Sequence, residues 1–225
     1  MATLLLLHPP LLGPSGWAPC AAALAAAGHH AVVPDLRPAL DPPPGWYDRA
    51  ATLAAHSLAA AGRATASAEL VVVAHSGAGV VLPVVADRVG ATAAVFVDAL
   101  LPGSPASDRF RGFLAGLPVT GGRLPRWSDW WGPDAMAELV PDPDLRARIA
   151  ADQPRLPLAF WDERVPVPVS WPPPRVGYLQ LSSAYDTEAA GATDAGWPVR
   201  TLPGEHLDLA TRPADVAAEI IALAT

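Results

Sequence analysis

Short runs of leucine, valine and other apolar residues recur along the chain and are separated by longer, alanine-rich stretches. Continuous apolar runs of four to eight residues are typical of strands that are buried on both faces of a parallel sheet. This pattern predicts strands at residues 3–7, 30–36, 69–74, 93–97, 176–181 and 199–202.

The stretches between these runs have the period of helices. Residues 17–27 are followed by Gly28, a residue that commonly ends a helix, and residues 50–66, 77–88 and 213–223 continue the pattern. Strand and helix therefore alternate, which favours βαβ units and a mostly parallel central sheet with helices on both faces, the α/β class.

Residues 101–174 interrupt this alternation. They hold five of the eight tryptophans and many prolines without a clear strand, and the proline-rich residues 165–174 are expected to form an extended connector. We interpret the whole stretch as a cap inserted into a single domain that spans residues 1–225, because one core suffices for a chain of this length.

Composition narrows the possible partners. The chain is 51% hydrophobic and 16% charged, with a net charge of −7 and no basic stripe, which argues against a nucleic-acid partner. The apolar run at the N-terminus stops at His8, so neither a signal peptide nor a membrane span is expected. The single cysteine, Cys20, can form no internal disulfide. We expect a cytoplasmic protein; the oligomeric state stays open.

The strongest chemical signal is the segment Ala74-His75-Ser76-Gly77-Ala78, which joins a predicted buried strand to a predicted helix. A sharp strand-to-helix turn with small neighbours lifts a serine hydroxyl above the sheet edge. Alanines replace both outer glycines of the Gly-x-Ser-x-Gly pattern. Ser76 is thus predicted to be a nucleophile.

A serine hydroxyl needs a base to become nucleophilic, and histidine is the usual base. His206 lies in the loop that follows the last predicted strand, so it should reach the same sheet edge as Ser76. The order of serine first and histidine near the end of the chain also suits this arrangement. We therefore predict His206 as the base.

Two aspartates are candidates for the acid that orients His206. Asp98 ends the strand next to the serine turn, where a buried carboxylate must find a partner. Asp186 follows the penultimate strand, but it also fits the first turn of a helix. The position of Asp98 is slightly favoured, and both remain open.

These motifs resemble those of the α/β-hydrolase superfamily, in particular its small esterase and hydroxynitrile-lyase-like branch. The resemblance covers essentially the whole chain and rests on residues 7–13, 33–37, 74–78 and 204–207. It implies the α/β-hydrolase fold and a Ser–His–acid triad. An acid may follow either of two late strands in that superfamily, and the position of Asp186 is the commoner one.

The resemblance also implies an oxyanion hole made of the Gly77 N–H and a backbone N–H of the loop after the first strand. Here the chain departs from the pattern, because Pro9 and Pro10 follow His8 and have no N–H. Either Leu11 or Leu12 must then supply the second donor, or the oxyanion hole is weakened, which leaves room for a non-hydrolytic reaction. His8 is expected to shape the loop.

The cap tryptophans are expected to wall a pocket for a hydrophobic small molecule; they are Trp127, Trp130, Trp131 and Trp161. No phosphate loop, dinucleotide motif or metal-ligand spacing is found in the sequence, so no cofactor and no metal are implied. The sequence thus favours a serine hydrolase of an ester, thioester or lactone. A lyase or cyclase that uses the same Ser/His pair, or a catalytically silent binder, are the alternatives.

Overall fold

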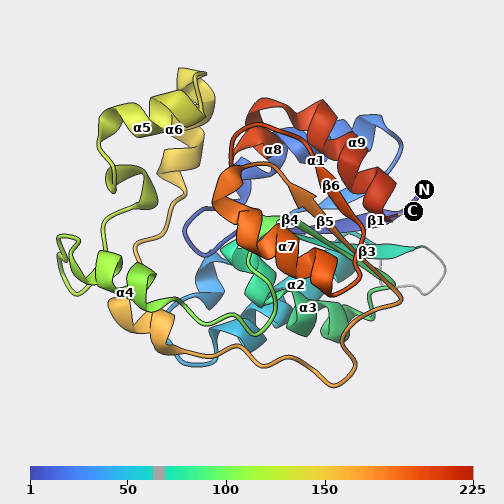
Figure 1. Cartoon of the computed structure of the whole chain (residues 1–225), viewed down its shortest axis with the longest axis horizontal. Coiled ribbons are helices and arrows are strands. Elements are labelled where there is room, and N and C mark those ends of the chain that lie inside the picture. The colour runs from blue at the N-terminus through green and yellow to red at the C-terminus, as the bar shows by residue number, and fades with distance from the viewer. Residues whose placement is uncertain (63–68, 225) are drawn as a thin grey trace.

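A computed structural model describes residues 1–62 and 69–224. In these residues six parallel strands form one sheet in the order β2-β1-β3-β4-β5-β6 (Figure 1). The strands are β1 (Thr3–Leu7), β2 (His30–Val32), β3 (Leu70–Ser76), β4 (Ala93–Ala99), β5 (Arg175–Gln180) and β6 (Val199–Thr201). The predicted parallel α/β arrangement is confirmed.

Nine α-helices lie within the described residues. They are α1 (Ala18–Ala26), α2 (Trp46–Ala60), α3 (Leu82–Val89), α4 (Asp108–Ala115), α5 (Pro133–Leu139), α6 (Pro143–Ala151), α7 (Asp186–Asp194), α8 (Asp208–Thr211) and α9 (Pro213–Ala224).

Each face of the sheet is buried because successive side chains of a strand point to opposite faces. Leu4 and Leu6 of β1 join the core under α1 and α9, whereas Leu5 and Leu7 join the core under α2 and α3. Helices cover both faces in Figure 1 as well. The continuous apolar runs of the sequence follow from this two-sided burial.

The structure corrects two predicted boundaries. The strand expected at residues 30–36 ends at Val32, because Pro34 has no N–H and the Leu36 N–H donates to His8 Nε2 at 2.9 Å. The helix expected at residues 77–88 is split into a 3-10 helix (Gly77–Val80) and α3, whose first turn contains Pro83. The end of the helix predicted over residues 50–66 lies outside the described residues.

Between β4 and β5 the chain leaves the sheet. Residues 101–174 contain α4, α5 and α6, which lie to one side of the sheet in Figure 1. Met136 and Ile149 of this segment join the core that also contains α1 and α9, so the segment is packed onto the sheet domain.

No helix in the described residues combines the length and the apolar character that a membrane crossing needs.

Gly79 marks the closest approach of two backbones near the sheet edge. A Cβ at this position would collide with the Leu100 carbonyl, whereas a Cβ on Gly112 of α4 would meet no atom. We expect Gly79→Ala to lower the free energy of unfolding by at least about 2 kcal/mol. In contrast, Gly112→Ala should raise it by about 0.5–1 kcal/mol. Urea unfolding of both variants measures the difference, and equal stabilities would contradict the packing described.

Candidate active site

Four polar side chains gather where the parallel strands end. Ser76 is the last residue of β3, Asp98 is near the end of β4, Tyr185 follows β5 and His206 follows β6. Because the carboxyl ends of parallel strands meet at one edge, residues far apart in the sequence come within hydrogen-bonding distance there.

Ser76 has a strained backbone. Its φ of 56° and ψ of −131° lie in a region that residues with a Cβ rarely adopt. The 3-10 helix that begins at Gly77 follows directly, so the turn presents the Ser76 side chain at the sheet edge. Its Oγ lies 3.0 Å from the hydroxyl of Tyr185.

Asp98 is fully buried and accepts four hydrogen bonds. Its Oδ1 accepts from the backbone N–H groups of Leu181 and Ser182, and its Oδ2 accepts from Ser182 Oγ at 2.7 Å and faces His206 Nδ1 at 2.7 Å. Burial alone raises the pKa of this carboxyl, but the hydrogen bonds from His206 and Ser182 outweigh burial and hold the pKa below its ordinary value. Asp98 is therefore a carboxylate at neutral pH.

A carboxylate at Asp98 fixes the tautomer of His206. The proton between them belongs to His206 Nδ1, which leaves Nε2 free to accept a proton. The His206 side chain is 17% exposed, and its ring stacks on Tyr185 with centroids 5.0 Å apart and planes 8° apart. Ser76 Oγ therefore contacts the hydroxyl of the same tyrosine whose ring stacks on His206.

His75 contacts both the backbone and the ring of His206. Its Nε2 donates to the backbone carbonyl of His206 at 2.9 Å, and the two rings lie 4.4 Å apart. Two effects keep the pKa of His75 well below its ordinary value: complete burial, which is the larger, and the nearby His206. His75 is thus a neutral positioning residue for the loop that carries His206.

Asp186 is not brought to His206. It is the first residue of α7, it is exposed, and its Oδ1 accepts from Gln180 Nε2 at 2.5 Å. Of the two candidate acids, the structure therefore places only Asp98 beside the histidine.

The loop after β1 is held by a turn. The N–H of Leu12 donates to the Pro9 carbonyl at 3.1 Å, which leaves Leu11 as the remaining candidate for the second oxyanion donor. His8 is buried and bonds to Pro9 and Leu36, a role that shapes the loop. The Pro10 ring lies next to Gly77, because a Cβ added to Gly77 would be 3.3 Å from Pro10 Cδ.

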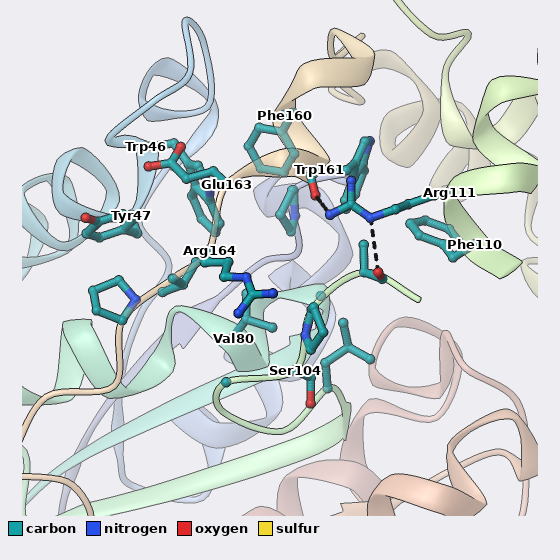
Figure 2. A pocket seen from close by; sticks show the side chains of 18 residues that line it. Trp46, Tyr47, Val80, Ser104, Phe110, Arg111, Phe160, Trp161, Glu163 and Arg164 are labelled. Atoms are coloured by element: carbon teal, nitrogen blue, oxygen red, sulfur yellow. Dashed lines mark hydrogen bonds between the residues drawn. The ribbon is translucent and has the colours of Figure 1, made fainter. Parts of the chain in front are cut away.

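A cavity of about 470 Å³ begins at Gly77 and Pro10. It extends between the segment after β4 and residues 160–166, and Figure 2 shows aromatic and arginine side chains on its walls. The labelled lining side chains include Trp46, Tyr47, Phe110, Arg111, Phe160, Trp161 and Arg164. Its size suits a drug-sized organic molecule.

Of the four cap tryptophans predicted for the pocket, only Trp161 lines this cavity. Trp131 instead packs against both Trp127 and Trp130, with ring centroids 5.4 Å apart in each pair, and Trp130 donates from Nε1 to the Pro125 carbonyl. The prediction is wrong for these three: Trp130 is buried within the 101–174 segment, Trp127 is partly buried and Trp131 is exposed, and none of them lines the cavity. Trp46 of α2 provides the second indole wall.

Metal ligands do not gather anywhere in the described part of the chain: no three His, Cys, Asp or Glu side chains form a group that could hold an ion.

Comparison with known proteins gives matches at the level of structure. No protein-family model and no curated protein matches the chain. The chain is similar to an extracellular α/β-hydrolase from a Paenibacillus species, with 15% identity, a TM-score of 0.66 and 99% of both chains covered. The chain has the α/β-hydrolase fold.

Two further structures of this fold show how varied its chemistry is. Polyneuridine aldehyde esterase matches with 15% identity, a TM-score of 0.70 and full coverage of both chains. A variant of tomato methylketone synthase I matches with 16% identity and a TM-score of 0.67, over 99% of this chain and 97% of the other. Since an esterase and a synthase share the fold, the reaction must be argued from the site.

Within this α/β-hydrolase fold, Tyr185 and Trp46 are the site residues that sequence reasoning missed. Tyr185 follows β5 at the same sheet edge as the other polar residues, so the rule that nominated Asp186 also applied to its neighbour. Trp46 has no such signal, because its place beside the cavity depends on how α2 packs.

The strain at Ser76 predicts a difference between two variants that both remove the hydroxyl. Glycine adopts positive φ without penalty, whereas alanine keeps the strain. We expect Ser76→Gly to exceed Ser76→Ala in free energy of unfolding by about 1 kcal/mol, after the entropy cost of glycine. Urea unfolding of the pair provides the measurement, and a less stable glycine variant would show that the turn is relaxed.

Proposed function

We propose that this protein is a serine hydrolase that cleaves an ester, thioester or lactone of a hydrophobic small molecule through an acyl-enzyme. The observation that carries the proposal is the 2.7 Å contact between His206 Nδ1 and Asp98 Oδ2, with Tyr185 in contact with both His206 and the strained Ser76. A buried carboxylate that fixes a histidine at the same sheet edge as a serine is the arrangement that acyl transfer by a Ser–His–acid triad uses.

In the proposed reaction, rotation about the Ser76 side-chain bond brings the hydroxyl from Tyr185 to His206 Nε2. His206 accepts the hydroxyl proton while Oγ attacks the carbonyl carbon, and Asp98 stabilises the imidazolium that forms. The imidazolium then protonates the leaving group. Water activated by His206 releases the acyl group and restores Ser76.

The cavity supports a substrate with a large apolar portion. Trp46, Phe160 and Trp161 supply aromatic walls, and the cavity begins at Gly77, next to the nucleophile. An aromatic or alicyclic group would bury its surface against these rings while its ester carbonyl reaches Ser76.

The loop after β1 favours one alternative. With Pro9 and Pro10 in sequence and the Leu12 N–H occupied, the backbone there offers fewer donors to an oxyanion than the superfamily pattern implies. A lyase or cyclase in which Ser76 and His206 only transfer protons needs no acyl-enzyme, and it is the second candidate. A catalytically silent binder would use the same cavity.

Labelling with a fluorophosphonate tests the activated serine. We expect the intact mass of the wild type to rise by one adduct, while Ser76→Ala and His206→Ala remain unlabelled, because phosphonylation needs both the hydroxyl and its base. An unlabelled but folded wild type would exclude the hydrolase and favour the lyase, the cyclase or the binder.

The two aspartates provide a matched pair for the acid. Asp98→Asn removes the acceptor that fixes the His206 tautomer, and we expect kcat on an aryl ester to fall by about 10³–10⁴-fold. Asp186→Asn changes an exposed residue that bonds to Gln180, so kcat should stay at the wild-type value. Steady-state kinetics measures kcat for both variants, and a larger loss in Asp186→Asn than in Asp98→Asn would reassign the acid to Asp186.

A further inference from the structure

Tyr185 has no assigned role in the proposed hydrolase, yet it contacts two of the three proposed catalytic residues. Its hydroxyl lies 3.0 Å from Ser76 Oγ, and its ring stacks on the His206 imidazole. We propose that Tyr185 is a catalytic residue whose phenol O–H donates to the substrate oxygen that becomes negative when Ser76 attacks. This inference rests on the proposed function.

The position of Tyr185 is fixed by the same carboxylate that fixes His206. Tyr185 ends a 3-10 turn (Ser183–Tyr185) directly after Ser182, and Ser182 donates to Asp98 from both its N–H and its Oγ. Asp98 therefore anchors the base on one side and the start of the tyrosine turn on the other. A donor held in this way needs little reorganisation during the reaction.

The loop after β1 offers few backbone donors to an oxyanion. Pro9 and Pro10 carry no N–H, the Leu12 N–H is bound to the Pro9 carbonyl, and the Pro10 ring lies against Gly77. Leu11 is then the remaining candidate in this loop for a second donor beside the Gly77 N–H, so a phenol O–H would add to an oxyanion hole that has few backbone donors.

A phenol that contacts Ser76 Oγ can reach the oxyanion. The carbonyl oxygen is separated from Oγ by the acyl carbon alone, so a group within hydrogen-bonding distance of Oγ needs only a small shift to contact it. Burial raises the pKa of Tyr185, which keeps the phenol protonated at neutral pH and suits a donor rather than a base.

The step balances without any further reactant. The Oγ–C bond forms as the Ser76 proton moves to His206 Nε2, and the carbonyl π pair becomes the oxyanion. Tyr185 donates a hydrogen bond to that oxygen and keeps its proton. When the oxyanion collapses, the C–O or C–S bond to the leaving group breaks and His206 returns the proton to the leaving group.

Tyr185→Phe tests the proposal, because it removes one oxygen and retains the ring that stacks on His206. We expect kcat to fall by about 10²-fold, the cost of one oxyanion donor, with KM little changed. The loss should be equal for an activated aryl ester and an unactivated alkyl ester. Affinity for a trifluoromethyl ketone analogue of the substrate, which forms an oxyanion adduct with serine, should fall by a similar factor.

Ser183→Ala is the matched control, since Ser183 is an exposed residue of the same turn. It should keep the wild-type kcat, and circular dichroism should show that both variants are folded. A merely structural role of Tyr185 would change KM and the unfolding midpoint instead of the affinity for the ketone.

Three results would overturn the proposal. Wild-type kcat in Tyr185→Phe would show that the phenol donates nothing, and a loss confined to alkyl esters would show that it protonates the leaving group instead. A folded wild type that turns over no ester and takes no fluorophosphonate would end both this proposal and the proposed function. An active, labelled wild type with an unaffected Tyr185→Phe would end only this proposal.

Discussion

The arrangement of the site depends on one buried carboxylate. Asp98 lies beneath the sheet edge with no solvent exposure, and an unpaired charge there would cost several kcal/mol. The chain compensates by directing four donors at it, from Leu181, Ser182 and His206. These contacts tie the end of β4 to the segment after β5 and to the loop after β6. The residues that would perform the chemistry are therefore positioned by the need to pair this single charge.

A second constraint acts on Ser76, whose backbone is held at a positive φ. The surrounding structure must impose this strain: β3 is paired with β1 up to Ala74 and with β4 up to Ser76, where the register shifts. Gly79 lets the following turn pass close to Leu100. A rigid parallel sheet thus supplies the fixed positions, while residues 101–174 contribute much of the cavity wall that lies beside them.

Much of this could be predicted from the sequence, because β-branched runs identify strands and a parallel sheet brings their ends together. That reasoning placed Ser76, Asp98 and His206 at one edge, as the structure does; their catalytic roles stay predictions. It could not choose between Asp98 and Asp186, since both follow strands and only the hydrogen bonds distinguish them. It missed Tyr185 and assigned too many tryptophans to the cavity, because tertiary packing, which has no local pattern, decides which aromatic ring faces inward.

The central claim is that Ser76 forms a covalent acyl intermediate, and rapid acid quenching during turnover of a slowly hydrolysed ester tests it most directly. The account predicts that intact-mass analysis shows a fraction of protein heavier by one acyl group, and that peptide mapping places this group on Ser76. Turnover at a measurable rate with unmodified protein at every quench time, including those before the first turnover ends, would contradict the account and favour chemistry without an acyl-enzyme.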